Sequence, residues 1–241
     1  SHEVAQGYRE VTEDSVYVKC RVTEGNAVVR PGDFILTWTT TPWTLPGNVA
    51  LAVGPDIQYV RVKVGKDHHI LAKALVEQVI EGPHKIAAEF VGRDFAGVSY
   101  GPLFPGAVDV ANAKTAFSVV PADFVTTTEG TGVVHTAVMY GEDDYQLGEQ
   151  VGLPKHHTVG LDGKFLPHVK GLAGRYVKAK ETESAIYEHL KKTGAFFRSV
   201  PYTHDYPFCW RCDTPLLYYA KDSWFIAMTK VKEELLKNAQ E

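Results

Sequence analysis

Short apolar stretches that alternate with polar residues dominate the chain, and most of them predict strands. The stretch "SVYVKCRV", residues 15 to 22, alternates with period two, which predicts a half-buried strand with Cys20 in the core. Eight further short stretches bounded by Gly, Pro or Asp are strand candidates: 33–40, 48–53, 57–64, 67–72, 86–91, 117–120, 132–136 and 196–202. Strands of this length need a shared core to be stable.

Helical periodicity is confined to a few segments. These are about 73–81, 142–151, 181–193 closed by Gly194, and a charged tail from about 228 onward. Many short strands with scattered helices predict an α/β (α+β) fold in which a β-barrel or sandwich core carries peripheral helices. Without an internal repeat or linker, residues 1–241 are interpreted as a single domain.

Composition narrows the class of protein. The 241 residues are 44% hydrophobic, which supplies a core, and the net charge of -4 argues against a protein that coats duplex nucleic acid or a polybasic membrane anchor. A local contact with one end of a nucleic acid is compatible with this net charge. Because no apolar stretch approaches about 18 residues and the start lacks a signal peptide, we expect a soluble cytoplasmic protein. Three cysteines, an odd number, indicate a reducing compartment.

The segment "TTTPWTLPGN", residues 39 to 48, is unusually rich in hydroxyl groups at the end of a predicted strand. Alternation places Thr37, Thr39 and Thr41 on one side of that strand. Pro42 cannot donate to a ladder, so pairing should stop there and leave backbone groups free. Two interpretations stay open: threonine as a good strand former at a solvated edge, or hydroxyls and amides that orient water and hold an oxyanion.

A second candidate region is "EGTGVVHTAVMYGEDDYQLGEQVG", residues 129 to 152. It predicts a glycine-rich turn, a buried strand ending near His135, and a helix opening at Gly141 with three acids in its first turn. Those acids could simply complement the helix dipole, and the histidine could be a hydrogen-bonded core residue. The chain has no phosphate loop, dinucleotide fingerprint, GxSxG elbow or HExxH motif.

Cys209 and Cys212 stand at CxxC spacing in "HDYPFCWRCDTPLLYY". Such a pair binds zinc when a second pair of ligands is near, and His204 is a candidate third ligand. No second CxxC or evident fourth ligand exists, so no metal and no cofactor is predicted for this chain by itself. A redox role is disfavoured because aromatic, strand-like segments flank the pair.

Together, "WTTTPWTLPGN", "GTGVVH", "GEDDY" and "YPFCWRCDTPLLYYAKDSWF" resemble the editing (connective peptide 1) domain of isoleucyl-tRNA synthetase, a class I aminoacyl-tRNA synthetase. The resemblance runs to about residue 230. It implies a β-barrel-centred domain with peripheral helices, excised from a larger enzyme, with about 1–30 and 200–241 leading toward the catalytic core. It also makes Cys209 and Cys212 half of a divided zinc knuckle. The HIGH and KMSKS signatures of amino-acid activation are absent.

The resemblance implies hydrolysis of the ester in valyl-tRNA, or of valyl-adenylate, by positioned water. Its partners would be the 3′ acceptor end of isoleucine tRNA charged with valine and the remainder of the synthetase, with no membrane and a monomeric state. The catalytic positions implied are Thr39, Thr40, Thr41 and Asn48. The substrate-binding positions implied are Trp38, Trp43, Thr44, His135 as the residue that narrows the pocket, and Asp144 as the partner of the α-ammonium.

One departure from the family pattern concerns the loop after the histidine. Many members have alanine-proline there, whereas this chain has Val138, which puts pocket depth and amino-acid preference in question.

Two alternatives remain beside the hydrolytic domain. One is a non-catalytic module that binds a tRNA acceptor end, and the other is a valyl or leucyl editing domain, which "TTPWT" disfavours.

Overall fold

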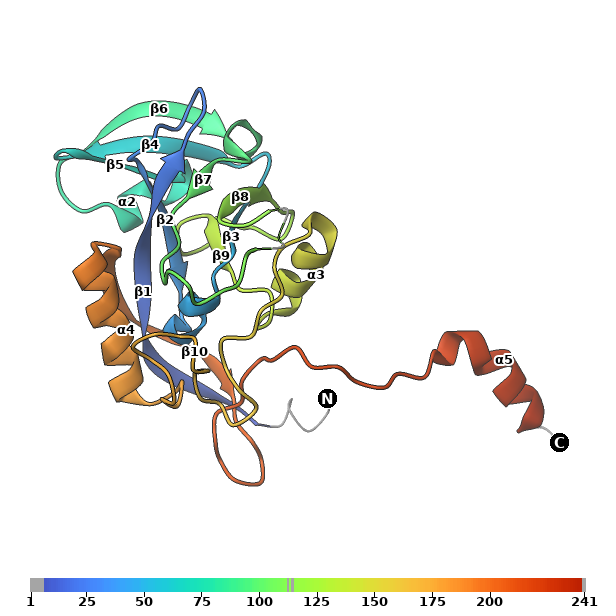
Figure 1. The fold of residues 1–241 in the computed structure, drawn as a ribbon. Coiled ribbons are helices and arrows are strands. Elements are labelled where there is room, and N and C mark those ends of the chain that lie inside the picture. Colours follow the sequence, from blue (N-terminus) through green and yellow to red (C-terminus); the bar gives the residue numbers. More distant parts are fainter. Residues whose placement is uncertain (1–6, 112, 114, 240–241) are drawn as a thin grey trace.

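Strands closed into a ring form the centre of the computed structural model, which describes residues 7–111, 113 and 115–239 (Figure 1). The strands are β1 (Tyr8–Glu24), β2 (Phe34–Thr39), β3 (Ala50–Val53), β4 (Gln58–Val64), β5 (Asp67–Ala72), β6 (Lys85–Val91), β7 (Ser99–Tyr100), β8 (Ser118–Pro121), β9 (Val133–Thr136) and β10 (Phe196–Pro207). The helices are η1 (Pro42–Gly47), η2 (Lys73–Leu75), α2 (Val76–Val79), η3 (Gly92–Phe95), α3 (Glu142–Val151), α4 (Lys180–Thr193) and α5 (Met228–Asn238). This mixed α/β architecture is the predicted class.

The ring arises because β1 pairs on two sides. The sheet runs in the order β10-β1-β7-β8-β3-β9-β2-β5-β4-β6, and an additional pairing joins β1 to β2. Strands β1, β7, β8, β3, β9 and β2 therefore form a closed circuit of hydrogen-bonded neighbours, while β10 and the β5-β4-β6 unit extend from it. Closure removes exposed edges from these strands and surrounds an apolar interior.

The predicted strands are present, with two longer than expected. β1 begins at Tyr8 and β10 ends at Pro207, because these two strands pair with each other antiparallel from Tyr8↔Pro207 onward. The hydrophobic pattern had not indicated this ribbon, since its half-buried face carries mostly polar and aromatic residues such as Glu13, Tyr202 and His204 rather than aliphatic ones. Cys20 is in the core as predicted, and burial raises the pKa of its thiol to about 12.

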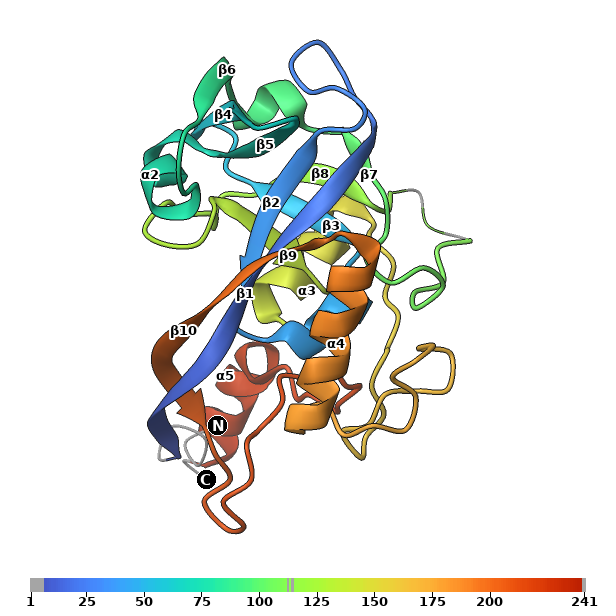
Figure 2. The same cartoon turned by 90° about the vertical axis from the view of Figure 1, so that its left-hand side faces the viewer.

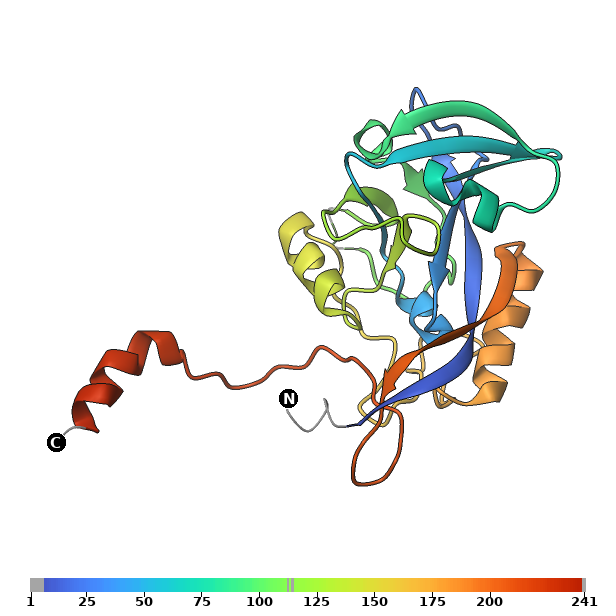
Figure 3. The ribbon, with the colours of Figure 1, turned by 180° about the vertical axis from the view of Figure 1, so that it is seen from behind.

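Two helices lie on different sides of the ring. α4 buries Thr182, Ile186 and Leu190, one face of the helix, and lies along the β1-β10 ribbon (Figure 2). It ends at Gly194, whose left-handed conformation favours glycine. α3 lies on the other side of the ring (Figure 3), and α5, which buries no residue, extends away from the rest. Among the described residues, no helix has the length and apolar character needed to cross a membrane.

Candidate functional site

The threonine segment ends β2 and enters a buried 3-10 helix. The backbone amide of Thr41 donates to the Thr39 hydroxyl at 3.1 Å, and the two hydroxyls lie 3.2 Å apart. Pairing stops before Pro42 as predicted, and η1 begins there, because proline fits the first position of a helix. The backbone amide of Thr41 is thus not free, since the Thr39 hydroxyl already accepts from it.

Five polar residues from three segments, the threonine segment, β7 and β9, form one hydrogen-bonded network. Tyr100 donates to Asn48 Oδ1 at 2.6 Å, and Asn48 Nδ2 donates to the Ala50 carbonyl at 3.0 Å. These two partners fix the orientation of the amide, so Asn48 Nδ2 also donates to His135 Nδ1, at 2.8 Å. The proton of His135 is therefore on Nε2, which donates to Thr44 Oγ1 at 3.0 Å, and Thr44 in turn donates to the Thr41 carbonyl at 2.9 Å.

His135 is held in a neutral state by this environment. Its side chain is 7% exposed, both ring nitrogens are bonded, and burial lowers its pKa to about 4. A neutral imidazole whose nitrogens are both engaged is not available as a proton acceptor. The hydrogen-bonded interpretation of the sequence analysis is thus confirmed, and a role in narrowing the pocket depends on the shape of the ring.

Asp144 lies in the first turn of α3, as predicted, with an unexpected partner. Its Oδ2 accepts from the backbone amide of Ala137 at 2.9 Å, two residues after His135, and no side chain caps the α3 N-terminus at Gly141. Burial raises its pKa to about 6, outweighing the Ala137 hydrogen bond. The Asp144 carboxyl is mostly ionised at neutral pH, and lowering the pH by one unit is enough to protonate about half of these groups.

Part of the threonine segment opens onto a cavity of about 200 Å³, here called the inner cavity. Its lining combines this segment with β10 and three tyrosines from elsewhere in the chain: Tyr8, Thr40, Thr41, Trp43, Thr44, Tyr140, His204, Asp205, Tyr206, Pro207 and Tyr218. The β10 wall and Tyr100 were not predicted from the sequence, because "HDYPFC" suggested only a metal site and an isolated tyrosine carries no pattern. His204, the candidate zinc ligand, faces this cavity instead.

The predicted site residues divide into three groups. Four line the inner cavity: Thr40, Thr41, Trp43 and Thr44. Three lie behind it in the hydrogen-bonded network, namely Thr39, Asn48 and His135. Trp38 packs edge-on against Tyr202 with ring centroids 5.1 Å apart, and Asp144 is on the α3 side of β9, outside the cavity lining. Val138, the position that departs from the family, is buried beneath α3 against Gly148.

Glycines shape the turn before β9. Gly130 and Gly132 both have positive φ, and a Cβ on Gly132 would lie 2.4 Å from the Cβ of Ala72. A side chain at either position would be strained, which accounts for "GTG" at this place. Trp38 lies against Gly130, where an added Cβ would come within 2.9 Å of its ring.

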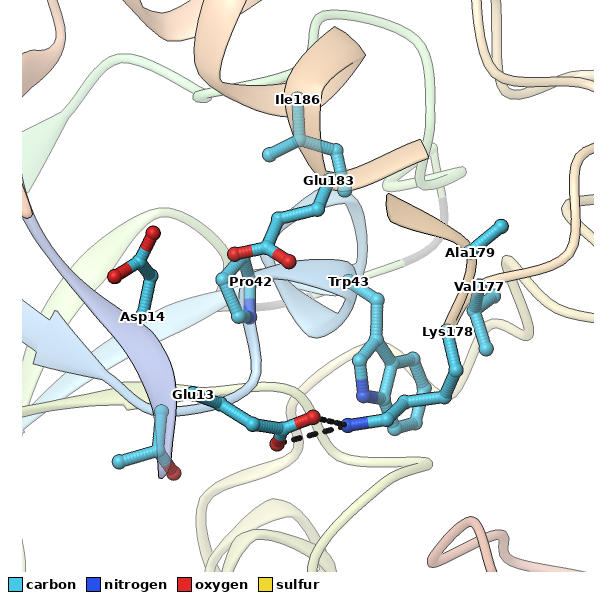
Figure 4. A pocket seen from close by; sticks show the side chains of 10 residues that line it. Glu13, Asp14, Pro42, Trp43, Val177, Lys178, Ala179, Glu183 and Ile186 are labelled. Atoms are coloured by element: carbon cyan, nitrogen blue, oxygen red, sulfur yellow. Dashed lines mark hydrogen bonds and ion pairs between the residues drawn. The ribbon is translucent and has the colours of Figure 1, made fainter. Parts of the chain in front are cut away.

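A second, smaller hollow of about 30 Å³ lies on the other side of Trp43 (Figure 4). Lys178 Nζ donates to both oxygens of Glu13, at 2.8 and 3.0 Å, beside the indole. Glu13 also lies 3.7 Å from His204 Nε2 across the ribbon. A hollow of this volume has room for bound water. Trp43 is thus a partition that separates this polar hollow from the inner cavity.

The cysteine pair lies on a turn outside the ring. Cys209 and Cys212 bracket a loop closed by the Asp213 amide donating to the Cys209 carbonyl at 2.9 Å, and Asp213 pairs with Arg9. Within the described part of the chain, no three His, Cys, Asp or Glu side chains converge as a metal site would require. The structure thus adds no third or fourth ligand to the pair.

Comparison with curated proteins identifies similar sequences among isoleucine–tRNA ligases. The chain is 48% identical over 238 residues to an isoleucine–tRNA ligase of Clostridium novyi and 41% identical over 238 residues to one of Bacillus thuringiensis. Both alignments include 99% of this chain, and the chain spans 22% of the length of each relative. No family model matches the chain.

Solved structures with a similar fold are more distant in sequence. Two crystal forms of the editing domain of a cytosolic leucyl-tRNA synthetase from P. falciparum superpose with TM-scores of 0.51 and 0.52. Each comparison covers 77% of this chain and all of the other, at 10% and 9% identity. Identity this low bears on the fold alone.

Proposed function

Because this chain belongs to the isoleucine–tRNA ligases, in which it corresponds to the editing domain, we propose that it hydrolyses the ester of valyl-tRNA with a positioned water molecule. The observation that carries the proposal is the row of threonine hydroxyls at the inner cavity, held in place by the Tyr100–Asn48–His135–Thr44 network. Preorganised donors of this kind stabilise developing negative charge.

The need for such a reaction follows from the size of the amino acids. Isoleucine exceeds valine by one methylene, about 0.8 kcal/mol of burial. A binding pocket cannot exploit so small a difference fully, a limit already established for isoleucyl-tRNA synthetases. A second and smaller pocket can exclude the larger residue by steric repulsion and destroy what enters. An inner cavity of about 200 Å³, backed by a rigid imidazole, is suited to this sieve.

We assign the chemical roles as follows. Thr39, Thr40 and Thr41, with Asn48 behind them, orient water and the terminal adenosine, while Trp43 and Thr44 form the cavity wall. The neutral ring of His135 limits its depth. No protein nucleophile is required, because an aminoacyl ester is already activated and positioning alone gives a large acceleration. A ribose hydroxyl of the adenosine is close enough by covalent connection to assist.

The proposed partners are the valine-charged 3′ end of isoleucine tRNA and the remainder of the synthetase, with the chain acting as a monomer in the cytoplasm. Pairing of Tyr8 with Pro207 places the outer ends of β1 and β10 side by side. That arrangement supports both segments leading to the same neighbouring domain. Amino-acid activation is assigned to the rest of the synthetase.

A deacylation assay tests the proposal directly. Valyl-tRNA and isoleucyl-tRNA, both made on isoleucine tRNA, are incubated with the protein, and ester loss is compared with buffer. We expect valyl ester to be lost faster than in buffer and isoleucyl ester not to be. Equal rates with and without protein would favour a module that only binds the acceptor end. A preference for esters other than valyl would favour the specificity of a valyl or leucyl editing domain.

Binding of valyl-adenosine should depend on pH through Asp144. With a pKa of about 6, only about a tenth of the carboxyl groups are ionised at pH 5, so affinity for the ammonium should be about tenfold lower there than at pH 7. His135, with a pKa of about 4, stays neutral throughout this range. Affinity should fall again above about pH 8, where an α-amino group loses its proton. Calorimetric titration with a non-hydrolysable analogue between pH 5 and 9 measures the profile, and a flat acidic limb would remove Asp144 from the site.

A further inference from the structure

A short turn connects the end of β9 to the start of α3 and is packed against that helix. Ala137 and Val138, which are 1% and 2% exposed, lie in this turn. The amide of Tyr140 closes the turn by donating to the Ala137 carbonyl at 2.9 Å. α3 begins directly afterwards, at Glu142, and brings Asp144 back onto the turn. The proposed reaction assigns a role to Asp144 but none to the packing that holds it.

Two neighbouring residues of the turn contact two positions of α3 that are one helical turn apart. Ala137 donates its backbone amide to Asp144 Oδ2 at 2.9 Å, and Val138 lies against Gly148. Residues four apart lie on the same face of a helix, so Asp144 and Gly148 both face the turn. The position of the carboxylate is therefore linked geometrically to the distance between the helix and Val138.

Gly148 allows α3 to approach the turn closely. A Cβ added at this glycine would lie 2.8 and 2.9 Å from the two methyl carbons of Val138, whereas ordinary contacts begin at 3.4 Å. Glycine is an unfavourable residue in a helix interior, because it loses more conformational freedom on folding than any other residue. The close approach to Val138 accounts for its presence in this helix.

Val138 has no space to move away from the helix. It belongs to a buried apolar cluster that includes Ala50 and Ala52 of β3 and Val120 of β8. Close-packed interiors of this kind do not yield to an added methyl group. The opposite face of α3 is solvated, as at Gln146. A larger side chain in place of the glycine would therefore displace the helix outward by several tenths of an ångström, and the valine would stay in place.

We propose that Val138 and Gly148 are positioning residues, which set the distance of α3 from the turn and thereby hold the Asp144 carboxylate where it meets the α-ammonium of the substrate. This inference rests on the proposed function, since it assumes that Asp144 binds the ammonium. A carboxylate that is displaced by a fraction of an ångström pairs less well with a cation whose position the rest of the substrate fixes. Neither residue touches the substrate, and both act through Asp144.

The pKa of Asp144 responds to this packing in the absence of any substrate. Burial raises the pKa to about 6, the Ala137 hydrogen bond opposes that rise, and the charge of Asp143 adds to it. Moving α3 outward admits water to the carboxyl group, so the pKa should fall toward its ordinary value. Glu142 lies in the same turn of the helix, and His135 on β9 is neutral above about pH 5, so neither obscures this change.

Gly148→Ala tests the inference, with Val138→Ala as the compensating change. Alanine favours a helix, so the single variant should fold, which circular dichroism checks. It should lower the Asp144 pKa, measured by NMR titration of the carboxyl group, by at least about half a unit. It should also weaken binding of a non-hydrolysable valyl-adenosine analogue at pH 7 about tenfold, less than complete loss of the charge would.

The double variant distinguishes positioning from a general loss of structure. Gly148→Ala combined with Val138→Ala lacks both methyl groups that the new side chain would meet, so the Asp144 pKa and the affinity for the analogue should both return to about the wild-type values. Gln146→Ala, a change on the solvated face of α3, is the matched control and should alter neither quantity.

The outcomes separate this inference from the proposed function. An unchanged Asp144 pKa in Gly148→Ala would overturn the inference, and so would recovery of the pKa without recovery of affinity in the double variant. If Asp144→Asn binds the analogue as tightly as wild type, the ammonium role of Asp144 itself fails. Weaker binding in Asp144→Asn together with normal binding in Gly148→Ala would contradict only the positioning by Val138 and Gly148.

Discussion

Asp144→Asn should weaken valyl-adenosine binding at pH 7 by at least about 30-fold. The substitution keeps the size of the side chain and an oxygen that can accept from the Ala137 amide, and it removes only the charge. Losing one member of a desolvated ion pair costs about 2–5 kcal/mol, and 1.4 kcal/mol corresponds to a factor of ten. Titration of both proteins with a non-hydrolysable analogue measures the change, and the acidic limb of the pH profile should vanish with it.

The stability of the same variant distinguishes a binding role from a structural one. The Asp144 pKa is raised from 3.8 to about 6, so the folded state binds more protons than the unfolded state between these values. Wild-type stability should therefore decline as pH rises from about 4 to about 6, and the variant should lack that decline. Asp143→Asn, a change at the exposed neighbour, should leave affinity unaltered. Unchanged affinity in Asp144→Asn would contradict its role as the ammonium partner.

His135→Ala should convert the protein from one that spares isoleucyl-tRNA to one that hydrolyses it. Removing the ring leaves space behind Thr44 and frees Asn48 Nδ2 and Thr44 Oγ1 from their contacts with the imidazole. A deeper pocket no longer excludes isoleucine, because the ring that would repel its additional methylene is absent. The variant should also lose about 2–4 kcal/mol of folding free energy through the cavity and the lost hydrogen bonds.

His69→Ala provides the matched control for this change. His69 is similarly buried, 4% exposed, and burial likewise lowers its pKa to about 4. It pairs with Phe34 at the opposite end of β2 from the threonine segment. We expect it to lose stability without gaining isoleucyl-tRNA hydrolysis. Ester loss measured on both tRNAs checks this, and continued protection of isoleucyl-tRNA in a folded His135→Ala protein would show that another residue sets the depth.

The secondary structure was largely predictable because it depends on local patterns. Alternation identified the strands of the ring except β7, which has only two residues and too short a pattern to detect. Gly194 marked the end of α4, since few other residues adopt its conformation at low cost. η1 was missed, because "PWTLPG" contains two prolines and no helical period.

The candidate site was only partly predictable. Residues close in sequence, such as Thr39 to Thr44, could be grouped from composition and from the family resemblance. Tyr100 and the β10 wall could not, because they reach the site only through ring closure and the β1-β10 ribbon. Their partners lie dozens of residues away, and no local pattern encodes such a contact.

By itself, the sequence determined the positions of most strands and helices, the stop at Pro42, the glycine-rich turn before β9, and the relationship to editing domains. Only the tertiary structure decided the charges and the shape of the site. The neutral state of His135 and the raised pKa of Asp144 both depend on burial. Burial is set by segments that meet through folding, and a side chain's protonation responds to the solvent that those segments exclude.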